Sequence, residues 1–453
     1  MRTKKLPPLS DNARLRYITF IALYFSQGIP EGLTIFAIPA WMAMQGISPV
    51  EIAKYSAIII IPFSLKILLA PFMEKFVYLP MGRRRPWLLF GQFGIFCSFI
   101  ALSTINDPMH NIDQLTWVVL CLHICIMFQD IATDSLVIDI VPLEQQGKAN
   151  SFMWGSKVVG TSTSLFVGSM LINQFGLSVT AISMSACIIA IMFIPISLRE
   201  RLGEKLLPWL PGNTSPESKL LTVDSWTKLF TSFWQAIKLR NLLLLLVSVF
   251  ITMTTIHYMR TLMPIFVIQE LKWDNVNYSK VYSTCNLTGG IIGMLLGAVI
   301  IQRFGIVKLI QGGLVALGSI ILTLACTTSM WTNHLYITGF IALFCTLLTL
   351  INIGVLALAM HLCWKRISAL QFTFCMTIFN AGLATGAALF GRLKPIYPWP
   401  TLLLFCCISL LLAMIIYALI KSGRHREQVD QLETKYLSLL NAEGKLLNET
   451  DAG

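Results

Sequence analysis

Residues 199–240 read RERLGEKLLPWLPGNTSPESKLLTVDSWTKLFTSFWQAIKLR, and they form the longest polar interruption in a chain that otherwise consists of apolar runs. Six apolar runs precede this stretch and six follow it. Each run approaches or exceeds the roughly 20 residues that a helix needs to cross a bilayer. The sequence therefore predicts an all-α, polytopic membrane protein with twelve transmembrane helices in two six-helix bundles.

The expected spans follow from the limits of the apolar runs. The first six cover 17–44, 52–72, 87–103, 115–140, 149–172 and 179–198. The second six cover 241–268, 278–301, 309–327, 335–362, 372–390 and 401–420. We accordingly expect an N-terminal bundle at 1–198, a linker at 199–240, a C-terminal bundle at 241–420 and a tail at 421–453.

Composition excludes the soluble classes of protein. Of the 453 residues, 55% are hydrophobic and only 12% are charged, whereas a soluble globule carries roughly 25% charged residues. A soluble enzyme, a disordered chain and a nucleic-acid-binding domain are all excluded, although the net charge is +12. The 11 cysteines lie mostly inside apolar runs without metal-binding spacing, so we expect neither a metal nor a disulfide framework.

The distribution of positive charge predicts the orientation. With the N-terminus placed inside, 26 of the 34 lysines and arginines fall on inner segments, 5 on outer segments and 3 within spans. Cytoplasmic segments are enriched in lysine and arginine, so we expect both termini to be cytoplasmic. In the linker, apolar residues from Trp226 to Ile237 recur at helical spacing, which predicts an amphipathic helix at the membrane interface. The tail is polar, with a weak helical pattern.

Ionisable residues inside the spans are the first functional candidates, because each costs about 2.5–3.5 kcal/mol at the bilayer centre. They are Glu31, Lys66, Asp130, Asp134, Lys157, His257 and Arg260. Lys66, Asp134 and Lys157 lie at similar depths, roughly 9–12 Å from the inner ends of their spans. The sequence predicts that these three form a buried charge layer in the N-terminal bundle.

Three carboxylates are candidates for carrying a proton: Asp130, Asp134 and Glu31. Asp130 and Asp134 are four residues apart on one helix face, so one of them tends to hold a proton unless a lysine neutralises it. Glu31 follows Pro30, which interrupts helical hydrogen bonding near the middle of the first span. The alternatives are a permanent salt bridge for the aspartate pair and a neighbouring helix that satisfies Glu31.

Cations and amides inside the spans are candidates for contacting a solute. His257 and Arg260 share a helix face, and together with the two lysines they would make a central cavity positive, which favours an anion. The substrate-contact candidates are Lys66, Lys157, His257, Arg260, Gln27 and Gln129. The alternative for Arg260 is that its side chain extends to the outer membrane interface.

Two loops in corresponding positions of the halves resemble each other. Glu74-Lys75-Phe76 and then Gly82-Arg83-Arg84-Arg85 follow the second span, and Gln302-Arg303-Phe304-Gly305 follows the eighth. This repetition indicates two related bundles, the arrangement behind rocking transport. We expect Glu74, Lys75, Arg83, Arg84 and Arg85 to form a gating loop that holds helix ends and the opposing bundle.

The N-terminal motifs, within about residues 24–160, resemble a known family. The matching segments are Gln27-Gly28-Ile29-Pro30, Pro62-Phe63-Ser64-Leu65-Lys66, Ala70-Pro71, Gly82 to Arg85 with Trp87, and Gln129-Asp130-Ile131 with Asp134. They are similar to the peptide/acetyl-CoA/drug transporter branch of the major facilitator superfamily, which includes AmpG-type muropeptide permeases and acetyl-CoA transporters. Two departures are Glu74-Lys75, where the family usually has Asp-Arg, and Glu31, at a position that is commonly apolar.

This resemblance implies a secondary transporter of the bacterial inner membrane. It would import a bulky anionic solute, muropeptide-like or acetyl-CoA-like, by proton-coupled alternating access. The expected partners are the solute, protons and the lipid bilayer, with no nucleic acid, and the expected state is a monomer. We expect no enzymatic activity and no cofactor, because the chain lacks a P-loop and a nucleophile elbow.

Other functions of the same fold stay open at this point. A siderophore permease and an exporter of a drug or metabolite are the alternatives within transport. A membrane sensor that does not transport is the alternative outside it. Small residues at Gly160, Ser164 and Gly168, and at Gly289, Gly293 and Gly297, predict close helix contacts. These faces suit either sliding contacts between spans five and eight or static packing.

Overall fold

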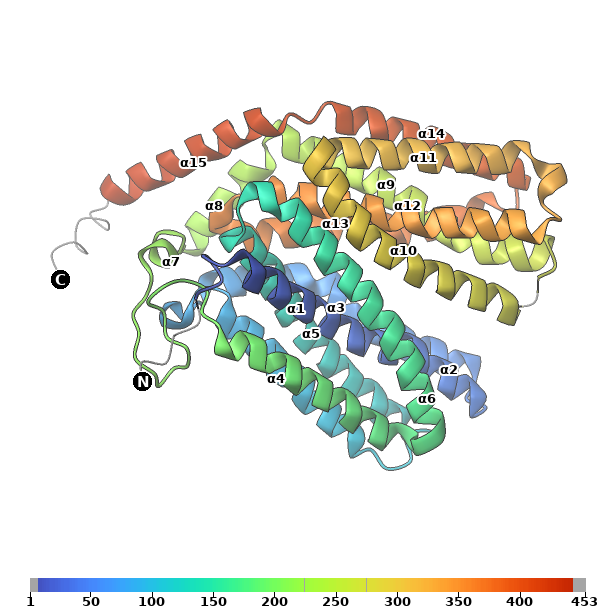
Figure 1. The fold of residues 1–453 in the computed structure, drawn as a ribbon, viewed down its shortest axis with the longest axis horizontal. Coiled ribbons are helices and arrows are strands. Elements are labelled where there is room, and N and C mark those ends of the chain that lie inside the picture. Colours follow the sequence, from blue (N-terminus) through green and yellow to red (C-terminus); the bar gives the residue numbers. More distant parts are fainter. Residues whose placement is uncertain (1–6, 224, 274, 443–453) are drawn as a thin grey trace.

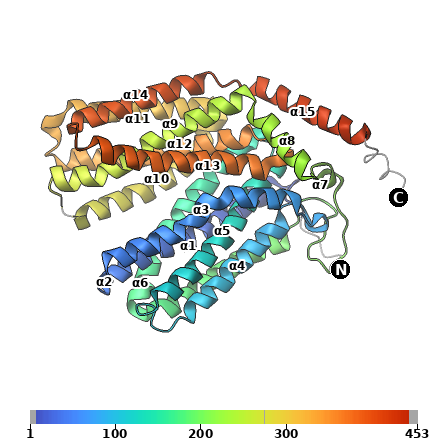
Figure 2. The same ribbon diagram turned by 180° about the vertical axis from the view of Figure 1, so that it is seen from behind.

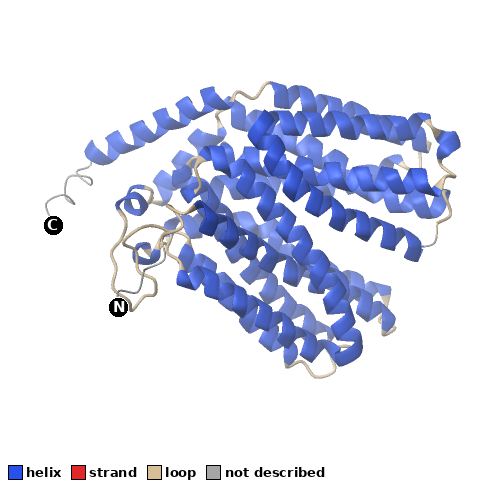
Figure 3. Cartoon of the chain, viewed as in Figure 1, coloured by secondary structure: helices blue, strands red, loops and turns tan. Residues whose placement is uncertain are grey.

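The structure is a computed structural model that describes residues 7–223, 225–273 and 275–442. Throughout this part of the chain the regular structure is helical and there is no strand (Figure 3). The all-α prediction is confirmed.

The helices fall into two bundles, with a linker and a tail (Figure 1). The N-terminal bundle contains α1 (Ala13–Glu31), α2 (Ile38–Met44), α3 (Pro49–Lys75), α4 (Arg85–Ser103), α5 (Ile112–Ile140) and α6 (Leu143–Ser197). The linker contains α7 (Pro216–Leu220) and α8 (Trp226–Ile237). The C-terminal bundle contains α9 (Arg240–Ile265), α10 (Asn275–Phe304), α11 (Ile306–Cys326), α12 (His334–His361), α13 (Ser368–Leu393) and α14 (Trp399–Ala418), and the tail forms α15 (Ser422–Ala442).

Eleven helical segments in the described residues are long and apolar enough to cross a membrane. One of them, α6, has 55 residues and is interrupted at Gly176, where φ is +80°. Glycine adopts this backbone conformation without steric cost. Counting the two parts of α6 separately accounts for the twelve expected spans. The loop expected at 173–178 is wrong, because a sharp kink replaces it.

The first span changes its helical form after Pro30, which lies inside α1. A π-helical stretch, Gly32–Ala37, follows directly and leads into α2. The glycines here serve close packing against α6. A Cβ atom on Gly32 would lie 2.3 Å from the Thr161 carbonyl oxygen, and one on Gly28 would lie 2.5 Å from that of Lys157. The backbones of α1 and α6 therefore meet without intervening side chains.

Replacing Gly32 by alanine is expected to destabilise the N-terminal bundle. The added Cβ meets backbone atoms, which cannot rotate away, so we expect a loss of roughly 1–3 kcal/mol. The midpoint of thermal unfolding in detergent measures the effect. Gly312→Ala in α11 is the matched control, because nothing lies within 4 Å of its Cβ position. Equal midpoints for the two variants would contradict the packing argument.

The two bundles meet along α6 and α10 and along α3 and α13. At the first contact, Gly147 faces Ile301 and Gly155 faces Met294. The small-residue faces divide between the two expected kinds of contact: Gly297 meets Ser151 of α6 across the bundles, whereas Gly160 packs on Phe25 of α1 and Gly293 packs mainly on Thr349 of α12 within their own bundles. Small residues allow close approach, but their spacing does not tell which helix is approached.

The bundle contacts concentrate at one end of the molecule. This end carries the start of α1, the linker and α15, and we call it the linker end; toward the far end the bundles diverge (Figures 1 and 2). The linker helix α8 buries Leu229 and Phe233, with the Phe233 ring centroid 5.5 Å from that of Phe374 in α13. Trp226 and Trp234 on the same helix are exposed. The orientation predicted from positive charge makes the linker end cytoplasmic.

Candidate functional site

Two groups of charged residues lie inside the molecule. We call the first the charge cluster; it contains Glu31, Lys66, Asp130, Asp134 and Lys157 from four helices of the N-terminal bundle. We call the second the latch; it contains Glu74, Arg83, Arg84, Asp139 and Ser368 at the linker end. The sequence identified each residue of the charge cluster as a separate candidate, but only part of the latch.

Lys66 lies between the two aspartates of α5. Its ammonium forms an ion pair with Asp130, and its Nζ lies 3.8 Å from Oδ2 of Asp134. Asp134 also accepts a hydrogen bond from the hydroxyl of Tyr24 in α1. Tyr24 is buried, and sequence reasoning missed it because a tyrosine inside a span carries no charge to mark it.

Lys157 pairs with Glu31, with 2.7 Å between Nζ and Oε1. Depth in the membrane groups Lys157 with Lys66 and Asp134, but in the structure the ion pair of Lys157 is with Glu31. Depth along a helix says nothing about the direction in which a side chain points around it. The close α1–α6 packing at Gly28 brings Glu31 and Lys157 to the same place.

The charge cluster holds three carboxylates and two ammonium groups. With every group ionised, its net charge is −1, and one proton makes it neutral. The side chains are at most 19% exposed, so little water compensates the excess charge. Asp130 takes the closest contact with Lys66. Asp134 is therefore the acid whose charge is less well compensated.

The two glutamine candidates occupy different surroundings. Gln129 donates to Ser26 Oγ at 2.7 Å and to the Leu23 carbonyl at 3.2 Å, which ties α5 to α1. Gln27 is fully buried beside Asp130. Both are thus part of the wall around the charge cluster.

Arg260 is the intramembrane cation that stands alone among the residues that the structure describes. It lies half-buried on α9 beside Tyr282 of α10 and Cys345 of α12. Its Nε is buried without a hydrogen-bond partner, and no ion pair forms with any described carboxylate. His257, half-buried, lies next to it on α9. An unpaired guanidinium inside the membrane is a candidate anion-binding group.

In the latch, two arginines share two carboxylates. Glu74 Oε2 lies 2.6 Å from Arg83 Nη2 and 2.7 Å from Arg84 Nη2. Asp139 Oδ2 lies 3.1 Å from Arg83 Nη1 and 3.0 Å from Arg84 Nε. All four side chains are fully buried. Their charges sum to zero, which is how buried charges are tolerated.

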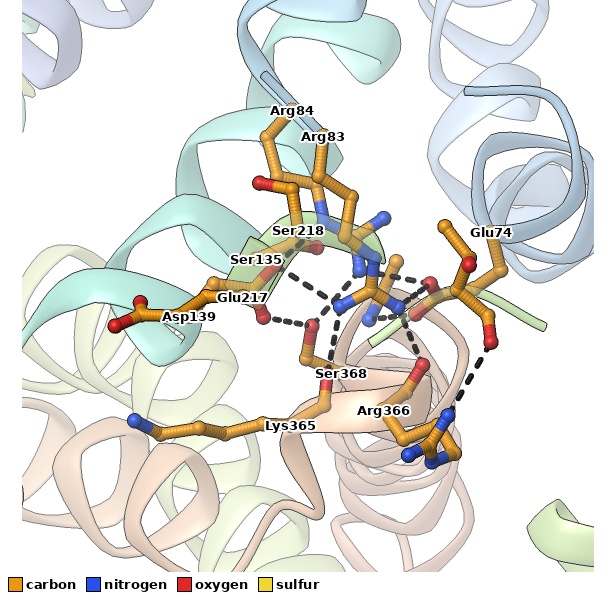
Figure 4. Close-up of polar contacts among 12 residues, drawn as sticks. Glu74, Arg83, Arg84, Ser135, Asp139, Glu217, Ser218, Lys365, Arg366 and Ser368 are labelled. Carbon is orange, nitrogen blue, oxygen red and sulfur yellow. Dashed lines mark hydrogen bonds and ion pairs between the residues drawn. The ribbon is translucent and has the colours of Figure 1, made fainter. Parts of the chain in front are cut away.

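The latch reaches across to the start of α13 in the other bundle (Figure 4). Arg83 donates to the Lys365 carbonyl at 2.8 Å and to the Arg366 carbonyl. Arg84 donates to Ser368 Oγ at 3.0 Å. These bonds fasten the loop after α3 to the opposing bundle.

The two carboxylates of the latch also form hydrogen bonds with the start of α13 in the other bundle. Asp139 accepts from Ser368 Oγ at 2.7 Å, and Glu74 Oε1 accepts from the Ala369 amide at 2.6 Å. A carboxylate is favourable at a helix start, where amides lack helical partners. Asp139 and Ser368 were missed from sequence, because an acid at a span end and a serine in a loop carry no distinctive signal.

The other two residues expected in the gating loop lie differently. Arg85 donates to the carbonyls of Pro195 at 2.7 Å and Ile196 at 2.8 Å, so it caps the end of α6 within its own bundle. Lys75 is half-buried and makes no hydrogen bond or ion pair with the described residues. The loop is anchored instead by Glu200, whose carboxylate accepts from the amides of Arg83, Arg84 and Arg85.

Two acids of this anchor have raised pKa values. Burial raises the pKa of Glu200, and burial next to Glu200 raises the pKa of Glu204 to about 7. Glu204 accepts from Ser218 Oγ at 3.0 Å, so it belongs to the packing of the linker against the bundle.

Two helical bundles with ion pairs inside the membrane and a charged closure at one end define a secondary transporter. The sequence matches the family model of the Major Facilitator Superfamily over residues 20–387. The chain belongs to this superfamily.

Two relatives illustrate the range of sequence similarity. The anhydromuropeptide permease of Escherichia coli (strain K12) is 24% identical over 402 residues, covering 86% of this chain and 76% of the permease. An uncharacterized protein, C21B10.09, of Schizosaccharomyces pombe is 27% identical over 180 residues, covering 37% of this chain and 32% of that protein.

Solved structures share the fold at low sequence identity. A bacterial homologue of the iron transporter ferroportin, in an outward-facing state, has a TM-score of 0.64 at 12% identity, covering 89% of this chain and 98% of the homologue. The transporter FucP in its outward conformation has a TM-score of 0.64 at 11% identity, covering 90% of this chain and 98% of FucP. As a member of the Major Facilitator Superfamily, this protein is an integral membrane transporter rather than an enzyme.

Proposed function

We propose that this protein is a proton-coupled importer of a bulky anionic solute, working by alternating access. The observation that carries the proposal is the charge cluster, which is one proton short of neutrality. A proton that neutralises Asp134 weakens the electrostatic attraction between Lys66 of α3 and the two aspartates of α5. Binding and release of that proton then bias the two states of the carrier.

Arg260 supports an anionic solute. Lys66 and Lys157 are already paired with acids, whereas the half-buried Arg260 has no carboxylate partner among the described residues. A muropeptide, which is a sugar joined to a short peptide, carries carboxylates that a guanidinium binds well. The permease relative of Escherichia coli, by its name, points to the same class of solute. We therefore rank muropeptide-like solutes before acetyl-CoA-like ones.

The arrangement of the bundles corresponds to the outward-facing state that an importer needs for loading. The linker end is closed by the latch, and the bundles diverge toward the far end (Figure 2). With the linker end facing the cytoplasm, as positive charge predicts, this is the state that loads solute from outside. Both termini are then cytoplasmic.

Uptake into proteoliposomes tests the proposal. We expect an inward proton gradient to drive accumulation of labelled anhydromuropeptide, and a protonophore to abolish it. Labelled acetyl-CoA, measured in parallel, tests the lower-ranked class. Folded protein that moves neither compound, or moves them without response to the gradient, would overturn the proposal.

Replacing Arg260 by glutamine is expected to raise the KM for the anionic solute about tenfold or more, the size of one lost charged hydrogen bond. The response to the proton gradient should persist, because the charge cluster is intact. Uptake at varied solute concentration measures the effect. Arg392→Gln, which changes an exposed arginine near the end of α13, is the control. An unchanged KM for Arg260→Gln would remove this residue from the binding site.

A second candidate function is export of a cationic solute, since the excess acid of the charge cluster also suits a positive group. Arg260→Gln separates the two. It should weaken transport of an anion, whereas it should leave unchanged or improve transport of a cation, which the arginine repels.

A further inference from the structure

The C-terminal helix α15 is attached to the loop between α12 and α13. Glu433 of α15 binds Arg366 through both oxygens, with Nη2 to Oε1 at 2.5 Å and Nε to Oε2 at 3.1 Å. The Trp364 indole donates to the same carboxylate at 2.6 Å. A paired carboxylate–guanidinium contact of this kind fixes orientation as well as distance.

Two further contacts hold the loop against α15. The guanidinium of Arg366, which is fully buried, lies 4.1 Å from the centre of the Tyr436 ring. His425 Nε2 donates to the Leu362 carbonyl at 2.8 Å. The tail thus binds the loop at its beginning, through Leu362, and near its end, through Arg366.

The same loop, in the C-terminal bundle, provides carbonyl groups that Arg83 of the latch binds. The Arg366 side chain binds α15, while its carbonyl accepts from Arg83 of the other bundle. The neighbouring Lys365 carbonyl also accepts from Arg83. Because a peptide unit is planar, the side-chain anchor of Arg366 limits where these carbonyls point. Arg366 therefore links the tail directly to the latch.

Among the described residues, α15 forms side-chain hydrogen bonds with the C-terminal bundle. These bonds join His425 and Glu433 to Leu362, Trp364 and Arg366, which all belong to the C-terminal bundle. Between α15 and the N-terminal residues Ile138 and Gln146 lies a cavity of about 220 Å³. When the bundles rock, these bonds carry α15 along with the C-terminal bundle.

We propose that α15 is a working part of the latch, in which Glu433 positions the loop carbonyls that Arg83 binds. Without Glu433, the loop carbonyls that Arg83 binds are no longer held in place, and the linker end opens more readily. Glu433 is a positioning residue and does not touch the solute. The inference rests on the proposed alternating access, but its test needs no solute, so its failure is distinct from failure of that function.

Thiol labelling tests the proposal in the full-length protein. Ser151→Cys reports opening, because Ser151 is buried in α6 with its Oγ 3.1 Å from the Cβ position of Gly297 in α10 of the other bundle. Ser185→Cys reports general loosening, because Ser185 is buried within the N-terminal bundle. N-ethylmaleimide is applied to each reporter alone and combined with Glu433→Gln, and mass spectrometry follows the reporter peptide despite the native cysteines.

We expect Glu433→Gln to raise the labelling rate at position 151 about tenfold, the size of one lost charged hydrogen bond, and to leave position 185 unchanged. Glu433→Asp should restore part of the protection. Glu427→Gln is the matched control, because Glu427 is exposed on the same helix. Unchanged labelling at position 151 would overturn the proposal. Equal increases at both reporters would also overturn it, because α15 would then serve only the stability of the fold.

Discussion

Proteoliposomes that contain Asp134→Asn are expected to lose proton-driven accumulation of the solute by about a hundredfold or more, the contribution typical of a positioned proton-transfer group. Asparagine keeps the shape of the side chain but cannot take up or release a proton. The charge cluster is then neutral at all times, as it is in the protonated carrier. Proton movement down the gradient is then no longer coupled to transport of the solute.

The same variant should retain exchange of solute across the membrane without a gradient. Exchange requires rocking of the solute-loaded carrier, which the neutral charge cluster permits. Counterflow of labelled solute against unlabelled solute inside the vesicles measures it. This result separates loss of coupling from loss of folding.

Asp113→Asn is the control for Asp134→Asn, because Asp113 lies on the same helix with its side chain 82% exposed. Lys54 pairs with it at 3.1 Å on the surface, and such exposed pairs contribute little. We expect this variant to transport normally. Accumulation by Asp134→Asn at the wild-type level would contradict the role given to the charge cluster.

Replacing Glu74 by glutamine is expected to have the largest effect on the latch. Arg83 and Arg84 would then share the single charge of Asp139, which leaves one buried positive charge without a partner. Breaking a buried ion pair in this way costs about 3–5 kcal/mol. Glutamine is also a weaker partner for the start of α13. We expect a lower thermal midpoint and faster maleimide labelling of Ser151→Cys.

A double variant tests whether charge balance is the cause. Glu74→Gln combined with Arg84→Gln returns the latch to zero net charge, with Arg83 and Asp139 left as a pair at 3.1 Å. We expect it to be more stable than Glu74→Gln alone. Glu144→Gln, an exposed acid at the start of α6, controls for a change of charge at this end. A double variant as unstable as the sum of its single changes would contradict the explanation.

Features that depend on one segment at a time were predictable from sequence. A span is recognised from its own length and apolar content, so the helices lie where the apolar runs are. The interruption at 173–178 shows the limit, because a single glycine conformation at Gly176 replaced the expected loop. Each member of the charge cluster was found because a charge inside a span is costly wherever its partner lies.

Features that depend on the rotation of a helix were not predictable from sequence. Depth grouped Lys157 with Lys66 and Asp134 but left its partner open, and packing between α1 and α6 made that partner Glu31. The same uncertainty affected the glycine faces, since Gly160 meets α1 while Gly155 meets α10. The contact of Tyr24 with Asp134 of the charge cluster was likewise visible only in the folded structure.

The sequence by itself determined that this protein spans a membrane in two similar halves, which residues are charged there, and which end carries the excess of positive loops. These properties follow from local free energies of transfer into the bilayer. Only the tertiary structure decided the partners, because Arg83 and the Arg366 carbonyl are 283 residues apart in the chain. Such contacts depend on how two bundles dock, and no local preference of either segment encodes that.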